Sequence, residues 1–324
     1  MLQITLTVPG EFAGRHVDGP SRSGAKSEAI VRVRRIGVCG TDLHAFAGRQ
    51  PFFTYPRVLG HELGVEIESV APGDHGLKAG DRCAVEPYYN CGRCPPCRRG
   101  RTNCCESLQV LGVHTDGGMR ERLAVPVARL HKSATLTFDQ LALVETLSIG
   151  RHAVLRAKPA RGESVLVVGA GPIGLAVTQF AVAAGATVTV LERNPLRAAF
   201  ANRFGAAGVE SVGGKLFDFV FDATGSKAAM EASFERVAFG GTLVFVGLIQ
   251  DRVSFDDPLF HRREMAVLAS RNSAAAFPPI IADIEAGRLD TTPWITHRLS
   301  LADVPAKFPL LPPDPTLIKA MIEA

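Results

Sequence analysis

"SVLVVGAGPIGLAVTQFAVAAG", residues 164–185, is the stretch that decides the fold of this 324-residue chain. A short apolar run leads into a glycine turn, and a longer apolar segment follows and stops at Gly185. The first run has the length of a buried strand and the second has the length of a helix. Gly169, Gly171 and Gly174 fit the pattern G-x-G-x-x-G between them. The stretch therefore predicts a strand, a turn and a helix whose N-terminus suits the pyrophosphate of a dinucleotide.

The next strand strengthens this prediction. "TVTVLE", residues 187–192, reads as a short buried strand that ends in Glu192. An acidic residue at the end of the second strand accepts hydrogen bonds from the ribose 2′-OH and repels a 2′-phosphate, which favours NAD. Arg193 and Arg197 follow closely and could instead serve a phosphate, so NADP stays open as the alternative.

Two further apolar runs, residues 217–222 and 241–246, also end in glycine or polar residues. Strands that alternate with helices predict an α/β fold with a doubly wound parallel sheet. The residues expected to line the cofactor cleft are the turn glycines with Pro172 and Ile173, and Thr224, Val246, Gly247 and Leu248 at later strand ends.

The first part of the chain has a different texture. Residues 1–135 hold short apolar runs broken by glycine and proline, which favours a mostly β domain. After residue 270 come a predicted helix at 278–287 and a proline-rich tail. We therefore expect a β-rich domain over 1–140, a nucleotide-binding domain over 141–270, and a segment over 271–324 that returns to the first domain.

Composition excludes several classes of protein. The chain is 46% hydrophobic and 21% charged, which is typical of globular domains. A net charge of +4 with no long basic run gives no support to nucleic-acid binding. No apolar run reaches the roughly 20 residues of a membrane helix. The first residues, MLQITLTVPGEF, lack the pattern of a signal peptide, so we expect a cytoplasmic protein.

Five of the seven cysteines lie within residues 91–105. Cys91, Cys94 and Cys97 are spaced C-x2-C-x2-C, and Cys104 or Cys105 supplies a fourth thiol. In a reducing compartment such a cluster indicates a closed structural zinc site. A redox pair and unligated surface thiols are the alternatives, but Pro95 and Pro96 indicate a loop rather than the helix start that a redox pair favours.

Two other fragments carry metal-ligand residue types. "GVCGTDLHAF", residues 37–46, contains Cys39, and "LGHELG", residues 59–64, contains His61. A catalytic zinc takes three protein ligands and keeps one position open. Two candidate ligands alone do not define a site, and a lone cysteine or histidine is more often a buried structural residue.

The order of these motifs identifies a family. "VCGTDLH", "GHELG", the C-x2-C-x2-C loop and "GAGPIG" together resemble the zinc-dependent medium-chain dehydrogenase/reductase family, in its sorbitol, threonine and sugar-acid dehydrogenase branch. The resemblance covers nearly the whole chain. It implies a GroES-like, mostly β catalytic domain, a Rossmann domain and a C-terminal segment that rejoins the first domain. The stretch between residues 205 and 217 is shorter than relatives usually have, which implies that a helix is missing from the outside of the Rossmann domain.

The resemblance also implies roles by position. Cys39, His61 and Glu145 match the catalytic zinc ligands, although Thr146 replaces a proline of that branch. By the family's spacing Cys105 joins Cys91, Cys94 and Cys97 in the structural site, and Cys104 is the spare. The remaining matches are Glu62 beside the metal, Asp42 orienting the histidine, Thr41 bonding the substrate oxygen, and His44 as proton relay.

The implied activity is hydride transfer between a secondary alcohol and NAD, with two zinc ions per chain, in a homodimer or homotetramer. The small-molecule substrate classes are polyols, sugar acids and hydroxy amino acids. Phe52, Phe53, Arg271 and Asn272 are candidates for the substrate pocket. The alternatives are a reductase of the same fold that prefers NADPH, and a catalytically silent cofactor-binding regulatory protein.

Overall fold

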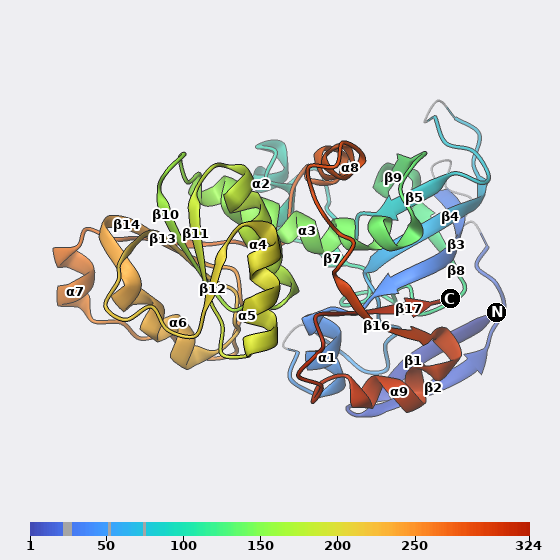
Figure 1. The fold of residues 1–324 in the computed structure, drawn as a ribbon. Helices are drawn as coiled ribbons and strands as arrows, with labels where there is room; N and C mark the ends of the chain where they lie inside the picture. Colours follow the sequence, from blue (N-terminus) through green and yellow to red (C-terminus); the bar gives the residue numbers. More distant parts are fainter. Residues whose placement is uncertain (22–27, 51–52, 74–75) are drawn as a thin grey trace. The chain divides into compact units, whose positions relative to one another are not determined.

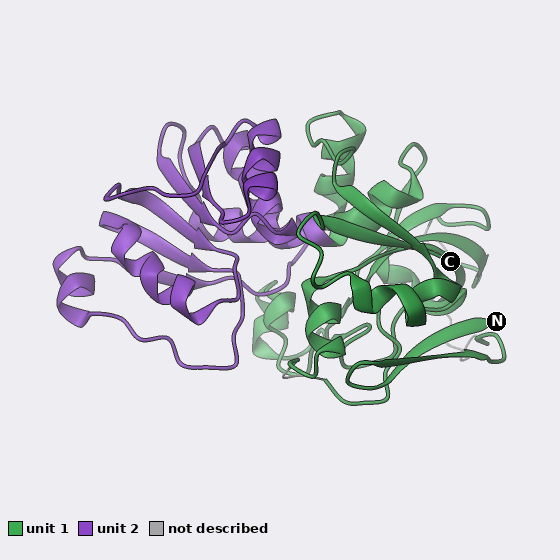
Figure 2. Ribbon diagram, turned by 60° about the horizontal axis from the view of Figure 1, so that its bottom comes forward, with its two compact units in different colours: residues 1–145, 277–324 green, residues 146–276 purple. Residues whose placement is uncertain are grey.

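The computed structural model describes residues 1–21, 28–50, 53–73 and 76–324. The chain divides into two compact units, shown in Figure 2. Unit 1 comprises residues 1–145 and 277–324, and unit 2 comprises residues 146–276. Both ends of the chain therefore belong to unit 1, and unit 2 is inserted between its two stretches. Phe52 lies outside the described residues.

Unit 1 is built on strands. Its main sheet, labelled in Figure 1, has the order β16-β17-β3-β4-β5-β9, and β8 also pairs with β3. The strands of unit 1 are β1 Leu2–Val8, β2 Glu11–His16, β3 Glu28–Gly37, β4 Glu62–Val70, β5 Arg82–Val85, β6 Tyr88–Tyr89, β7 Gln109–Val110, β8 Arg122–Pro126, β9 Leu130–Ser133, β16 Ile295–Ser300 and β17 Lys319–Glu323. Its helices are α1 Gly40–Phe46, α2 Pro95–Arg98, α8 Phe277–Glu285 and α9 Val304–Lys307.

Strand β3 shows why this sheet forms. Val31 and Val33 are buried in the core of unit 1, whereas Arg32 is exposed between them. This alternation places one face of the strand on the core and the other towards water. The last strand, β17, pairs antiparallel with β3 through Met321, Ile322 and Glu323. The C-terminal segment thus completes the sheet of the N-terminal residues.

Unit 2 is a parallel sheet with helices. Its strand order is β12-β11-β10-β13-β14-β15, and every neighbouring pair is parallel. The strands are β10 Ser164–Val168, β11 Thr187–Leu191, β12 Ala207–Val209, β13 Phe217–Asp222, β14 Val237–Phe245 and β15 Ala266–Ala269. The helices are α4 Pro172–Ala183, α5 Pro195–Ala201, α6 Lys227–Ser233 and α7 Asp257–Arg262. The predicted strand, glycine turn and helix are β10, residues 169–171 and α4.

Helix α3, Phe138–Ala157, was not predicted from the sequence. The boundary between the two units falls within it, at residues 145 and 146. Gly150 lets α3 approach α4 closely, because a Cβ there would lie 2.5 Å from Ala176. The stretch between β12 and β13 holds no helix, as the resemblance to the family implied. Within the described residues, no helix combines the length and apolar character needed to cross a bilayer.

Candidate active site

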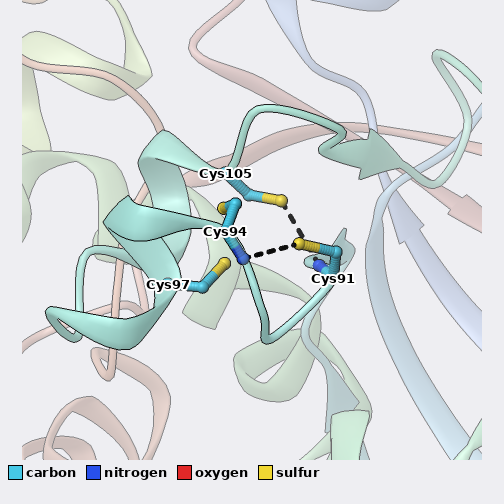
Figure 3. A group of neighbouring side chains, drawn as sticks. All are labelled: Cys91, Cys94, Cys97 and Cys105. Atoms are coloured by element: carbon cyan, nitrogen blue, oxygen red, sulfur yellow. Dashed lines mark hydrogen bonds between the residues drawn. The ribbon is translucent and has the colours of Figure 1, made fainter.

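The loop between β6 and β7 gathers four cysteines. Strands β6 and β7 form a short antiparallel ladder, with Tyr88 opposite Val110 and Tyr89 opposite Gln109. In the loop, prolines at the start of α2 turn the chain after Cys94. Figure 3 shows the side chains of Cys91, Cys94, Cys97 and Cys105 converging, with ligand atoms all within 4.8 Å of one another. The structure brings Cys105 into this group and leaves Cys104 outside it.

Backbone N–H groups favour thiolates in this loop. The backbone N–H of Cys91 donates to Sγ of Cys105 at 3.3 Å, and that of Cys94 donates to Sγ of Cys91 at 3.4 Å. Hydrogen bonds from the backbone at Arg93 and Cys94 lower the pKa of Cys91 to about 6. Four converging sulfur donors fit a tetrahedral zinc ion with no open position. Such a site stabilises a loop and binds no substrate.

A second group forms where two segments of unit 1 meet. Cys39 is the residue before α1, and His61 precedes β4, whose first residue is Glu62. Ligand atoms of Cys39, His61 and Glu62 all lie within 4.8 Å of one another. His61 and Glu62 are buried, and Cys39 is half-buried. The structure therefore brings together two motifs that are about twenty residues apart in the chain.

Asp42 adds negative charge beside His61. Its Oδ2 accepts a hydrogen bond from the backbone N–H of Cys39 at 2.9 Å, and its Oδ1 lies 3.8 Å from Nδ1 of His61. Oδ1 of Asp42 and Nδ1 of His61 are both buried, and neither has a hydrogen-bond partner among the described residues. Burial would lower the pKa of His61, but the charges of Cys39, Asp42 and Glu145 raise it well above its ordinary value. This pocket of sulfur, nitrogen and oxygen donors with excess negative charge fits a zinc ion.

Glu145 lies outside the group formed by Cys39, His61 and Glu62. The resemblance made it the third zinc ligand, but the carboxylate that lies within 4.8 Å of both Cys39 and His61 is that of Glu62. Glu145 is 4% exposed on α3, and its Oε1 accepts a hydrogen bond from the hydroxyl of Tyr88. Its charge still interacts with that of His61. Two carboxylates thus face the same histidine, and each is held by its own donor.

The donor to Glu62 is Lys319, which sequence reasoning missed. Nζ of Lys319 donates to Oε1 of Glu62 at 2.6 Å, and both side chains are almost fully buried, 1% and 0% exposed. Burial would lower the pKa of Lys319, but the charges of Glu62, Cys39 and Glu145 raise it. The signal in the sequence is one lysine in an otherwise apolar run, "LIKAMI". Buried lysines are rare unless they are paired.

The two predicted relay residues both lie on α1. Thr41 is half-buried and His44 is exposed. Desolvation, and after it the charge of Arg49, lower the pKa of His44 from its ordinary value. At pH 7 the imidazole of His44 is therefore neutral and able to accept a proton. Phe53 lies in the same unit, with its ring 4.9 Å from that of Tyr55.

Unit 2 contains a pocket of about 510 Å³ at the ends of its strands. Gly169, Gly171, Glu192, Arg193, Arg197 and Thr224 are among its lining residues. Gly174 is required at the start of α4, because a Cβ there would lie 1.9 Å from the backbone oxygen of Gly169. Pro172 and Ile173 form the first turn of α4. The carboxylate of Glu192 accepts the backbone N–H of Ala170 at 2.7 Å and that of Asn194 at 2.9 Å.

Other predicted residues of unit 2 lie outside the lining of this pocket. Val246, Gly247 and Leu248 follow β14, where Gly247 packs so closely on Gly225 that a Cβ would lie 2.7 Å from its nitrogen. Arg271 is exposed, and Asn272 has a left-handed backbone with φ of 48°. The structure therefore gathers the glycine turn, Glu192 and Thr224 in one pocket, and leaves these five residues elsewhere in unit 2.

Comparisons with known proteins agree with this geometry. Residues 25–135 match the alcohol dehydrogenase GroES-like domain family, and residues 172–286 match the zinc-binding dehydrogenase family. The chain is 42% identical over 290 residues to L-galactonate-5-dehydrogenase of Escherichia coli K12, covering 85% of each chain. It is 34% identical to D-altritol 5-dehydrogenase of Agrobacterium fabrum, covering 91% of this chain and 92% of that protein.

Solved structures give the same result. An Escherichia coli CFT073 alcohol dehydrogenase complexed with NADH superposes with a TM-score of 0.92 at 27% identity, covering 100% of this chain and 99% of that one. A zinc-binding dehydrogenase from Sinorhizobium meliloti bound to NADP also gives a TM-score of 0.92, at 28% identity and the same coverage. One relative thus holds NADH and the other holds NADP.

The chain belongs to the zinc-type medium-chain alcohol dehydrogenase family. It is an oxidoreductase with a GroES-like part and a Rossmann-type parallel sheet. The predictions of fold class, of enzyme class, and of zinc and a nicotinamide nucleotide as cofactors are confirmed.

Proposed function

We propose that this protein oxidises a secondary hydroxyl group of a sugar acid or polyol, with NAD as the acceptor. The observation that carries the proposal is the buried group of Cys39, His61 and two carboxylates in unit 1. The 42% identity to a sugar-acid dehydrogenase supports the substrate class. We also propose the division expected from the sequence: a catalytic domain over 1–140, a cofactor domain over 141–270, and a returning segment over 271–324. The two compact units support that division.

The proposed ligands of the catalytic zinc are Cys39, His61 and Glu145. Glu62 is the nearer carboxylate, but the ion pair with Lys319 already compensates its charge. Among the described residues, the hydrogen-bond donor to Glu145 is the neutral phenol of Tyr88, so the negative charge of Glu145 remains available to a cation. When bound, zinc acts as a Lewis acid that lowers the pKa of a substrate hydroxyl.

The other residues orient groups and move a proton. Asp42 is proposed to orient the histidine through the charge of its carboxylate, which lies 3.8 Å from Nδ1 of His61. Thr41 is proposed to hydrogen-bond the substrate oxygen, and neutral His44 to carry its proton towards solvent. The nicotinamide cofactor, when bound, accepts the hydride. In the pocket of unit 2, the carboxylate of Glu192 supports a preference for NAD, through hydrogen bonds to ribose hydroxyls.

A reductase that prefers NADPH is the second candidate. One observation favours it: Arg193 and Arg197 line the same pocket as Glu192, and guanidinium groups bind phosphate. Steady-state rates with NAD and NADP distinguish the two, because a clear preference for NADP contradicts the proposed role of Glu192.

The proposed assembly is a homo-oligomer that uses the edge of the sheet in unit 2. Strand β15 is the last strand on that side, and Ala266, Val267 and Ala269 are exposed. An exposed apolar edge favours pairing with a second copy of the same strand. Light scattering is expected to give at least twice the 34.5 kDa chain mass. Free thiols at all seven cysteines support the reducing cytoplasm as its location.

Metal content together with a substrate panel tests the proposed function. We expect about two zinc ions per chain and NADH formation with a sugar acid or polyol. Cys39→Ser is expected to leave about one zinc ion and remove activity while the fold persists. One zinc ion per wild-type chain, with no turnover of any alcohol in the panel, contradicts the proposal.

A further inference from the structure

Residues 90–108 form the four-cysteine loop, and the paired strands β6 and β7 on either side of it form its stem. It pairs with β7, and the residues between the two strands contain Cys91, Cys94, Cys97 and Cys105. Because the loop connects the two strands, a contact that holds the loop in one conformation also holds Tyr88 in register opposite Val110. A two-residue ladder has little stability of its own, so its geometry depends on what surrounds it.

The residue that follows β6 contacts the cysteine group. Nδ2 of Asn90 lies 3.6 Å from Sγ of Cys97 and donates a hydrogen bond to it. The amide of Asn90 is held in turn, because its Oδ1 accepts a hydrogen bond from the guanidinium of Arg129. Arg129 also pairs with Glu86 at 3.2 Å. The residue directly after β6 is thus tied both to the cysteine loop and to a charged pair on the body of unit 1.

Tyr88, within the stem, contacts the second site. Tyr88 is 4% exposed, and its hydroxyl donates to Oε1 of Glu145, a residue 57 positions later in the chain. Tyr88 and Asn90 are two residues apart, and each donates to a proposed metal ligand of a different site. The neighbour Tyr89 contrasts with both, because its hydroxyl is buried without a hydrogen-bond partner among the described residues.

We propose that Tyr88 is a positioning residue that couples the four-cysteine loop to the catalytic carboxylate Glu145. The loop holds the β6–β7 ladder in place, and the ladder sets the position of the phenol of Tyr88. The phenol then holds one oxygen of Glu145 through its hydrogen bond. The other carboxylate oxygen stays available to the metal. The coupling rests on the proposed role of Glu145 as a zinc ligand.

The expected size of the loss at the catalytic metal follows from the role of residues that hydrogen-bond metal ligands. Carboxylates that hold a metal are themselves hydrogen-bonded, and loss of such a partner typically weakens the metal site about 10–100-fold. A glutamate side chain has three rotatable bonds, so removal of its single phenol donor leaves several rotamers open. The four-cysteine group keeps all of its own ligands when Tyr88 changes. The coupling therefore predicts a loss confined to the catalytic metal.

The test uses the full-length holoprotein and the variant Tyr88→Phe, which keeps the ring and removes only the hydroxyl. Release of zinc to the chelator 4-(2-pyridylazo)resorcinol is followed by absorbance. We expect release from the catalytic site to accelerate about 10–100-fold, with release from the four-cysteine site unchanged. In protein whose catalytic site is loaded with cobalt(II), the visible absorption band is expected to shift, which a purely structural role would not cause. Tyr89→Phe is the matched control and is expected to leave both measurements as in the wild type.

Two further variants make the outcomes distinct. Asn90→Ala leaves the hydroxyl of Tyr88 in place but frees the stem, and it is expected to shift the cobalt band in the same direction. Wild-type release and spectrum in both Tyr88→Phe and Asn90→Ala overturn the coupling. Glu145→Gln tests the underlying assignment: if it retains catalytic zinc as the wild type does, Glu145 is not a ligand. If Glu145→Gln loses that zinc while Tyr88→Phe does not, the proposed function stands and the coupling fails.

Discussion

Lys319 and Glu62 form an ion pair inside unit 1 although 257 residues separate them in the chain. The lysine is the first residue of β17, and the glutamate is the first residue of β4. Both strands flank β3 in one sheet, which places their first residues on either side of it. The pair brings a fixed positive charge next to the proposed catalytic ligands, where it offsets one of several negative groups.

Lys319→Met is expected to destabilise the protein strongly. The change leaves the carboxylate of Glu62 buried without its cation, and breaking a buried pair in this way costs about 3–5 kcal/mol. The free energy of unfolding, measured by denaturant titration, is expected to fall by that amount. Lys307→Met is the control, because Lys307 pairs with Asp303 on the surface, where such pairs contribute about 0–1 kcal/mol. Equal losses in the two variants would contradict the role assigned to burial.

The two adjacent cysteines are expected to differ sharply. Cys105→Ser removes a sulfur atom of the converging group, whereas Cys104→Ser removes one that lies outside it. Zinc bound per chain is expected to fall from about two to about one in Cys105→Ser and to remain at about two in Cys104→Ser. Elemental analysis after gel filtration measures the difference. The reverse result would exchange the two ligands.

Glu192→Gln is expected to shift the choice of cofactor. The amide keeps the size of the side chain and retains an oxygen for the backbone N–H of Ala170, but it removes the charge that opposes a 2′-phosphate. The ratio of kcat/KM for NADP to that for NAD is expected to rise roughly tenfold, about 1.4 kcal/mol. Glu210→Gln changes the charge of the same pocket at another point and is expected to alter the ratio less. Equal shifts would attribute the preference to net charge alone.

Asp139 is expected to make stability depend on pH. It lies in the first turn of α3 and pairs with Arg35 at 2.8 Å and with Arg298 at 2.5 Å. Burial would raise the pKa of Asp139, but the hydrogen bonds and charges of Arg298 and Arg35 lower it below its ordinary value. A depressed pKa contributes stability above the unfolded value of about 4, and this contribution is lost as pH falls through the folded value.

The measurement compares Asp139→Asn with the wild type by thermal unfolding across pH. At pH 7 the variant is expected to be less stable by about 1.5–3 kcal/mol, the range of hydrogen bonds to charged groups. Below about pH 4 the gap is expected to narrow, and the two curves are expected to converge once pH falls through the lowered pKa of folded Asp139, where the wild-type carboxyl becomes protonated. Asp18→Asn, at an exposed position, serves as the control. A gap of constant size at every pH would exclude the charge as its cause.

Local patterns were enough to predict the Rossmann half of the fold. The run from Ser164 to Gly185 carries its strand, turn and helix in consecutive residues, and the close approach at Gly174 is a local requirement. Helix α3 was missed because its 20 residues mix apolar with polar and charged side chains without forming a clear apolar stripe. Such a run cannot be assigned from its period alone.

Contacts between side chains that are far apart in the sequence could not be predicted. Tyr88 lies in a short aromatic strand with no local signal of function, and the one local signal for Lys319 is its charge in an otherwise apolar run, which does not name a partner. Their partners, Glu145 and Glu62, lie 57 and 257 residues away. The motif resemblance named candidate ligands, but the donor that holds each carboxylate follows only from the packing of strands in unit 1.

The insertion of unit 2 within unit 1 sets an order of events on the ribosome. All of residues 146–276 are synthesised before β16 and β17, so the Rossmann-type unit is available to fold while the other sheet still lacks two strands. At ~5–20 residues per second, ~13–50 s pass between translation of Glu62 and of Lys319. Throughout that interval Glu62 lacks Lys319, the cation that pairs with its carboxylate when it is buried. The nascent chain therefore completes the scaffold for its cofactor first and closes the buried charge pair last.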